Sequence, residues 1–221
     1  MLPAAHSFRR EGHSRTDRAW SFAAKNANTV QPPGRSMIWG ESRDQLVAVG
    51  QRLAAAHLVR HSEGNLSLRV DQSRILVTPT GSDLGRLDPP ELVEVNLEAS
   101  VIPQRATSEV NLHIEIYRRR ADVQAIVHAH PPQLLRLDAK GGLPRSRIVE
   151  DCGRMLGRVV SADHFKEGSL ALAEAAASAL ARANACVLCG HGAVTLGSSL
   201  MQAFVRMLDF ERAASLTPMR R

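Results

Sequence analysis

The sequence has 221 residues, enough for one globular domain around a single core. Apolar residues make up 44% of it, an ordinary share for a protein that folds in water, and no stretch approaches the roughly 18 apolar residues of a membrane span. Aromatic residues make up 4%, which leaves few side chains to stack on single-stranded nucleic acid. The three cysteines are too few and too scattered for a disulfide framework, so we expect a reducing compartment, the cytoplasm. Composition therefore argues against a membrane protein and a nucleic-acid-binding protein.

The net charge of +6 is concentrated at the N-terminus. Residues 1–36 hold six basic and two acidic residues, and the segment contains too little apolar surface to offset the entropy of ordering it. We predict a disordered basic extension over residues 1–36 and a folded domain over residues 37–221. Two alternatives stay open for the extension: Met37 is the true start, or the segment is a mitochondrial presequence. A nucleic-acid-binding role would depend on this terminal charge alone.

The first half of the domain changes from a helical to a strand-like pattern. Apolar residues with a helical period predict a helix over residues 44–58. Residues 65–70 and 75–78 form two β-type runs joined by a short polar turn, which predicts a hairpin, and residues 92–97 alternate like a strand. Thr107 or Ser108 can cap the next helix, which we expect to run to about residue 120.

The second half continues the alternation of strands and helices. Residues 125–129 are a short apolar strand, and residues 168–184 are an alanine-rich helix. Residues 185–188 and 193–196 are typical of two further strands, and residues 198–214 of a final helix. Because several strand pairs resemble hairpins, we predict an α/β fold in layers, with helices covering a central sheet that is mainly antiparallel or mixed.

The end of the strand at residues 125–129 carries two histidines, His128 and His130. Residues i and i+2 of a strand project from the same face, so both imidazoles can reach one metal ion at about 2.0–2.1 Å each. Two solvated histidines at a strand end are an equally good reading of this motif alone. A third ligand would decide between them.

His191 is the candidate for the third ligand. It lies between two glycines and two predicted strands, an arrangement that permits a tight turn, although such a turn is by itself commonplace. Cys186 and Cys189 are spaced like a thiolate site. In an extended strand, however, their sulfurs would face opposite sides, so we interpret these cysteines as packing residues.

A further group of polar residues begins the helix predicted after residue 107. Glu109 follows Thr107 and Ser108, which is typical of ordinary helix capping, but its carboxylate could also serve as a base or an additional metal ligand. We expect His113, one turn later, to be a hydrogen-bonding or packing residue. Two loops, at residues 62–65 and 78–82, could each bind an anion through hydroxyls and backbone N–H groups, or could each be a simple turn.

In chain order these motifs resemble the class II aldolase/adducin family. The matching stretches span roughly residues 41–214: Gly64-Asn65-Leu66-Ser67, Thr78-Pro79-Thr80-Gly81, Thr107-Ser108-Glu109, Ile126-Val127-His128-Ala129-His130-Pro131 and Gly190-His191-Gly192. Each motif alone is weak evidence. Their common order is specific, because three of the five carry demanding chemistry.

The resemblance implies a class II aldolase-like fold, a homotetramer and a role for each matching residue. His128, His130 and His191 would bind zinc, with Glu109 close to the metal as the catalytic group. The substrate's phosphate would be bound by residues similar to the family's phosphate-binding residues: Asn65, Thr80, Gly81, Thr107 and Ser108. The implied reaction is cleavage of a carbon–carbon bond in a ketose phosphate through a metal-stabilised enediolate. Three imidazoles would also accept cobalt, nickel or iron.

Several alternatives remain open at this point. The same centre could decarboxylate a 3-oxo sugar acid phosphate, epimerise a pentulose phosphate at carbon 4 or dehydrate a thiosugar phosphate. A non-catalytic adducin-like interaction domain is also possible, although such a domain has no need for three converging histidines. Two departures concern the substrate half of the site: the single tyrosine, Tyr117, lies inside a predicted helix, and Glu63 places a carboxylate beside the first phosphate loop.

Overall fold

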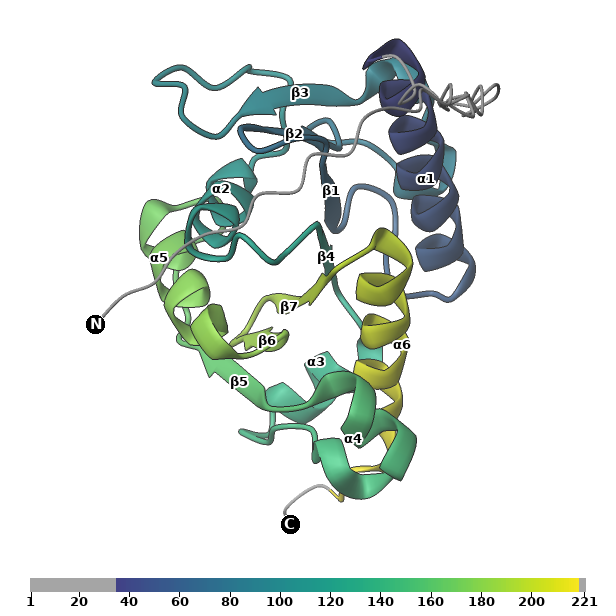
Figure 1. Ribbon diagram of the computed structural model, residues 1–221. Coiled ribbons are helices and arrows are strands. Elements are labelled where there is room, and N and C mark those ends of the chain that lie inside the picture. Colours follow the sequence, from purple (N-terminus) through teal and green to yellow (C-terminus); the bar gives the residue numbers. More distant parts are fainter. Residues whose placement is uncertain (1–34, 219–221) are drawn as a thin grey trace, which may run out of the picture. The chain divides into compact units, whose positions relative to one another are not determined.

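The computed structural model describes residues 35–218, which form a seven-stranded mixed sheet with helices on both faces (Figure 1). The strand order is β3-β2-β1-β4-β7-β6-β5, and every neighbouring pair is antiparallel except the parallel pair β5–β6. The strands are β1 (Asn65–Arg69), β2 (Arg74–Val77), β3 (Val93–Asn96), β4 (Ala125–Ala129), β5 (Val159–Ala162), β6 (Ala185–Leu188) and β7 (Gly192–Gly197). The predicted layered α/β fold with a mixed sheet is confirmed.

Two hydrophobic layers enclose the sheet, one on each face (Figure 1). The helices are α1 (Arg35–Ala55), α2 (Val110–Arg119), α3 (Pro132–Asp138), α4 (Glu150–Leu156), α5 (Leu170–Ala179) and α6 (Leu200–Leu216). Side chains of α1, α3, α4 and α6 pack on one face, and those of α2 and α5 on the other. In β4, Val127 belongs to the first layer and Ile126 to the second, so His128 projects toward the layer of α2.

Several predicted helix boundaries are wrong. Helix α1 begins at Arg35 rather than at residue 44, and α2 begins at Val110, because the Thr107 hydroxyl accepts a hydrogen bond from the Glu109 N–H instead of capping the helix. The alanine-rich helix ends at Ala179, and a short 3-10 turn follows. Because α1 begins at Arg35, the predicted domain boundary after residue 36 falls within this helix. Residues 1–34 lie outside the described residues, so their disorder stays a prediction.

Three elements had no counterpart among the predictions. Helix α3 starts with Pro132, where a proline costs nothing because the first N–H groups of a helix lack intrahelical partners. Strand β5 is short and only partly buried at the sheet edge, so its sequence has little hydrophobic pattern. Helix α4 has only seven residues. None of the helices within residues 35–218 is long and apolar enough to cross a membrane.

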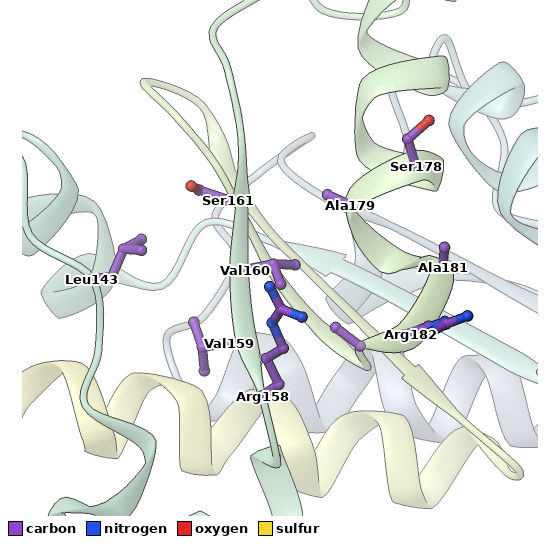
Figure 2. Close-up of a pocket in the computed structure, with 10 residues that line it drawn as sticks. Leu143, Arg158, Val159, Val160, Ser161, Ser178, Ala179, Ala181 and Arg182 are labelled. Carbon is purple, nitrogen blue, oxygen red and sulfur yellow. The ribbon is translucent and has the colours of Figure 1, made fainter.

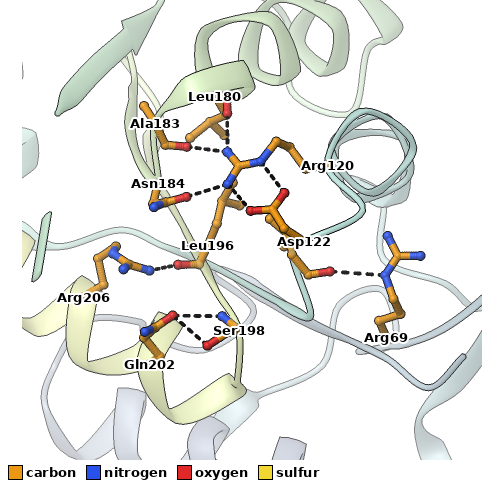
Figure 3. Close-up of polar contacts among 11 residues, drawn as sticks. Arg69, Arg120, Asp122, Leu180, Ala183, Asn184, Leu196, Ser198, Gln202 and Arg206 are labelled. Carbon is orange, nitrogen blue, oxygen red and sulfur yellow. Dashed lines mark hydrogen bonds and ion pairs between the residues drawn. The ribbon is translucent and has the colours of Figure 1, made fainter. Parts of the chain in front are cut away.

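Two arginines tie the ends of these elements together (Figure 3). Arg120, just after α2, donates hydrogen bonds to the carbonyls of Leu180 and Ala183 at 2.7 and 2.9 Å and pairs with Asp122. Arg206 of α6 is buried and donates to backbone carbonyls, including that of Leu196 in β7. Arg120 thus joins the end of α2 to the segment after α5, and Arg206 joins α6 to β7 and to the end of α4. They fix the two elements whose opposite ends supply Glu109 and the turn of His191.

Candidate metal centre

Three histidines from two segments converge at one end of the sheet. His128 ends β4, His130 follows it directly, and His191 lies in the turn between β6 and β7, the strand that pairs with β4. Their ring centroids are 4.9–5.1 Å apart, and one potential ligand atom from each lies within 4.8 Å of the others. Within the described part of the chain, no other group of three or more histidine, cysteine or acidic side chains has metal-binding geometry.

The orientation of these rings fits a tetrahedral metal ion. His128 Nδ1 donates to the Ala193 carbonyl at 3.0 Å, so Nε2 is the atom turned toward the other rings, where a metal would displace the proton that it otherwise shares with Glu109. The Nε2 atoms of His128 and His130 are 3.2 Å apart. Two nitrogens bound to tetrahedral zinc at about 2.0–2.1 Å would be about 3.3–3.4 Å apart. The spacing of this pair therefore fits two ligands of one zinc ion or a similar divalent metal, and the ligand atom of His191 lies within 4.8 Å of both.

Glu109, the last residue before α2, faces the same cluster. Its Oε2 lies 2.9 Å from His128 Nε2 and accepts a hydrogen bond from the Asn65 amide at 3.0 Å. Its Oε1 is buried, has no hydrogen-bond partner among the described residues and lies 3.6 Å from His191 Nε2. A buried carboxylate oxygen without a donor is costly, and a nearby cation would remove that cost.

The electrostatics of the cluster favour an ionised glutamate beside imidazoles. Burial alone would raise the pKa of Glu109, but the charge of His128 and their hydrogen bond lower it well below the ordinary range. Burial alone would lower the pKa of His128, yet Glu109 raises it. The pKa of His130 falls to about 3 because of its burial and the neighbouring imidazoles. His130 is therefore neutral near pH 7 and has a lone pair available for a metal.

Glycines allow the histidines to approach one another. Gly190 has φ +70°, and its N–H donates to Asp138 at 2.7 Å, which fixes the turn that carries His191. A Cβ on Gly192 would lie 2.7 Å from His130 Cδ2 and 3.0 Å from His128 Cε1. The β7 backbone thus packs directly against both rings, and no larger residue fits.

We expect Gly192→Ala to lower zinc affinity on the order of tenfold to a hundredfold, because overpacking of about 1–3 kcal/mol would displace the two rings. Isothermal titration with zinc measures this change. Gly40→Ala is the matched control, since a Cβ at Gly40 meets nothing within 4 Å. Equal zinc affinity in the two variants would show that β7 does not hold the rings in place.

The residues predicted to bind a phosphate lie around one cavity of about 360 Å³ that includes the histidines. Its lining comprises Ser62, Glu63, Gly64, Asn65, Pro79, Thr80, Gly81, Thr107, Ser108, Glu109, His128, His130, Glu167 and His191. The structure thus brings all nine predicted site residues together. Thr80, Gly81 and Ser108 are exposed and available to a ligand, whereas the buried Asn65 amide and Thr107 hydroxyl already bond to Glu109.

The cavity also contains a carboxylate that the sequence did not indicate. Glu167 lies in the loop before α5, outside every motif. Burial lowers the pKa of His191, and the negative charge of Glu167 partly opposes that lowering. Glu63 lines the cavity as predicted, but its side chain accepts a hydrogen bond from the Arg60 N–H at 3.0 Å. No lysine or arginine of the described residues lines this cavity. A phosphate here would be bound by hydroxyls and backbone N–H groups.

The cysteines and a second hollow lie apart from this chemistry. Cys186 is buried in β6 as a packing residue, whereas Cys189 lies in the following turn and is only partly buried.

A hollow of about 530 Å³ follows the exposed side of β5 near Arg158 and Arg182, whose side chains point in different directions (Figure 2). Since none of its lining residues is a candidate ligand, it does not compete with the histidine cluster.

The chain belongs to the class II aldolase and adducin family, whose domain described as Class II Aldolase and Adducin N-terminal domain matches residues 44–217. The resemblance expected from the motifs is thereby confirmed. The L-fuculose phosphate aldolase of Methanocaldococcus jannaschii is 33% identical over 176 residues, 79% of this chain and 94% of that protein. The 3-oxo-tetronate 4-phosphate decarboxylase of Pectobacterium atrosepticum is 32% identical over 79% of this chain and 83% of that protein.

Solved structures support the same relationship. The L-fuculose-1-phosphate aldolase of Thermus thermophilus superposes with a TM-score of 0.72 at 29% identity, covering 81% of this chain and 92% of that one. The fold and the family are therefore shared along most of both chains. The similar proteins carry two different activities, so similarity alone does not choose between them.

Proposed function

We propose that this protein is a zinc-dependent lyase that cleaves a carbon–carbon bond of a ketose phosphate, in the manner of an L-fuculose phosphate aldolase. The observation that carries the proposal is the convergence of three imidazoles and the orphaned Glu109 oxygen in one cavity. Similarity to a fuculose phosphate aldolase over 94% of its length supports the substrate class. Assembly as a homotetramer and a cytoplasmic location belong to the same proposal.

The chemistry requires a group that accepts negative charge and a group that moves a proton. Bound zinc would supply Lewis acidity toward the hydroxyl and carbonyl oxygens of the substrate. Breaking the bond turns the hydroxyl of the departing carbon into an aldehyde, which releases one proton, and leaves an electron pair on the carbon beside the carbonyl, which must take one proton up. Glu109 would hold this proton at Oε1, the oxygen that no protein donor engages. Oε2 stays bonded to Asn65, which keeps the carboxylate in place.

The far end of the substrate would lie against the exposed loops. Thr80, Gly81 and Ser108 present hydroxyl and backbone groups to the cavity and would bind a phosphate away from the reacting carbon. Binding energy gained there would orient the substrate at the metal. Tyr117 is 2% exposed and hydrogen-bonded inside the core, so it does not reach the cavity as a proton donor.

A decarboxylase is the second candidate, because a 3-oxo-tetronate 4-phosphate decarboxylase is nearly as similar as the aldolase. Loss of carbon dioxide from a 3-oxo acid leaves the same kind of charge beside a carbonyl. The two reactions need the same metal centre and differ in the group that leaves. An epimerase or a dehydratase would need the same metal centre, with different side chains around the rest of the substrate.

Elemental analysis of protein purified without added metal or a histidine tag is the first test, and about one zinc per chain is expected. The loaded protein is then assayed with L-fuculose 1-phosphate for aldehyde release and with a 3-oxo-tetronate 4-phosphate for carbon dioxide release. Aldehyde without carbon dioxide supports the aldolase, and carbon dioxide alone favours the decarboxylase. Protein that neither contains zinc nor takes it up at neutral pH would instead support an adducin-like interaction domain.

A further inference from the structure

Behind the metal centre, five buried side chains form one continuous chain of hydrogen bonds. The Tyr117 hydroxyl lies 3.0 Å from the Ser67 hydroxyl, which lies 2.6 Å from His113 Nδ1. His113 Nε2 lies 2.6 Å from Asn65 Oδ1, and Asn65 Nδ2 lies 3.0 Å from Glu109 Oε2. All five side chains are at most 5% exposed. This chain of hydrogen bonds starts at Tyr117 in α2 and Ser67 in β1, and it ends at the Glu109 carboxylate, which faces the three histidines.

The direction of every hydrogen bond follows from the charge of Glu109. An ionised carboxylate accepts only, so Asn65 must turn its NH₂ toward Glu109 and its oxygen toward His113. His113 must then donate from Nε2, which leaves Nδ1 as an acceptor for the Ser67 hydroxyl. Ser67 has no second hydrogen, so it accepts from Tyr117, whose single hydrogen is shared between Ser67 at 3.0 Å and the Gln124 carbonyl at 3.3 Å. The opposite direction would place the Asn65 oxygen against a carboxylate.

We propose that His113, as its Nε2–H tautomer, is a positioning residue that orients the Asn65 amide toward Glu109 Oε2 and so leaves Oε1 free for the reaction. The proposal rests on the proposed function, in which Glu109 carries the proton. His113 touches no substrate and no metal ligand; it acts through Asn65.

The geometry explains why a histidine is useful at this buried position. A neutral imidazole has one donor and one acceptor on opposite sides of a rigid ring. It can therefore accept a hydrogen bond from Ser67 and donate one to Asn65 at the same time. Burial lowers the pKa of His113 to about 3, so the ring stays neutral near pH 7 and adds no charge behind the metal. The four neutral side chains behind Glu109 satisfy one another's hydrogen bonds, which avoids the cost of burying unpaired polar groups.

Nitrogen-15 NMR of the histidine rings tests the direction of the chain without any substrate. Nε2 of His113 should be protonated and Nδ1 unprotonated, with no titration between pH 5 and 8, in both metal-free and zinc-loaded protein. A His113 ring protonated at Nδ1 instead of Nε2 would reverse the direction of these hydrogen bonds and overturn the proposal. This measurement stands even if the protein proves inactive on every ketose phosphate, so failure of the proposed function is distinguishable from failure of the positioning role.

Two substitutions test the consequence for activity. Glutamine at this position retains one donor and one acceptor, whereas leucine retains neither, so His113→Gln should keep kcat within about threefold while His113→Leu lowers it on the order of 10–100-fold. KM and zinc content should change little in both. Thermal unfolding separates folding from positioning, because a purely structural role would make activity follow stability. If the two variants lost kcat equally, or if His113→Leu kept it, His113 would not position Glu109.

Discussion

Replacing His191 by alanine is expected to lower zinc affinity on the order of 10²–10³-fold while the protein still folds. Apparent zinc affinities of about 10–16 kcal/mol shared among four ligands correspond to about 2.5–4 kcal/mol for one of them. The fold should tolerate the change because the His191 ring lies in a turn, is 12% exposed and has no hydrogen bond at Nδ1 within residues 35–218. Without the metal, lyase activity should be lost.

Competition with a fluorescent zinc chelator measures this affinity, and circular dichroism verifies the fold. His164→Ala is the matched control, because His164 lies beside the same turn, with Nδ1 3.1 Å from the Cys189 carbonyl, yet is not among the clustered ligands. The control should keep its zinc. If His191→Ala bound zinc as tightly as the control, the assignment of three histidines to the metal would fail.

The parts of the fold that the sequence predicted are those governed by local pattern. Strands β4 and β6 have the predicted bounds because each is a short, wholly buried apolar run between polar turns. The i, i+2 spacing of His128 and His130 is likewise local, so their projection from one face could be expected from sequence. The convergence of His191 on them depends on the pairing of β7 with β4, and it was expected only from the family resemblance.

The parts that the sequence could not predict depend on contacts between distant segments. The Thr107 hydroxyl was expected to cap α2, but it bonds to Glu109 within a bend that an isolated bridge between Pro79 and Ala106 holds against the loop after β2. Asn65 was expected to bind phosphate, yet its amide is shared by Glu109 and His113, residues 44 and 48 positions away. Glu167 enters the cavity from a loop with no motif. The bridge to Pro79, the partners of Asn65 and the position of Glu167 all depend on segments far apart in the sequence.

The role of Glu109 leads to the second large effect. Glu109→Gln should retain about one zinc per chain, because the three imidazoles are unchanged, and should lose turnover on the order of 10²–10⁴-fold, the usual contribution of a positioned acid–base group. A glutamine can accept the Asn65 hydrogen bond with its oxygen, which turns its NH₂ to the position of Oε1, where a proton must be held and returned. The substitution thus preserves shape and hydrogen bonding and removes only the basic oxygen.

Metal content and kcat, measured on the same preparation, separate the two roles of this side chain. Glu115→Gln is the matched control: it lies on the same helix and pairs with Arg118 at 3.1 Å and Arg119 at 3.5 Å, away from the cavity. Loss of zinc from Glu109→Gln would make Glu109 a ligand rather than a proton carrier. Turnover equal to that of the control would remove Glu109 from the mechanism, and the proton would then have to be carried by another group of the cavity, where Glu63 and Glu167 are the other carboxylates.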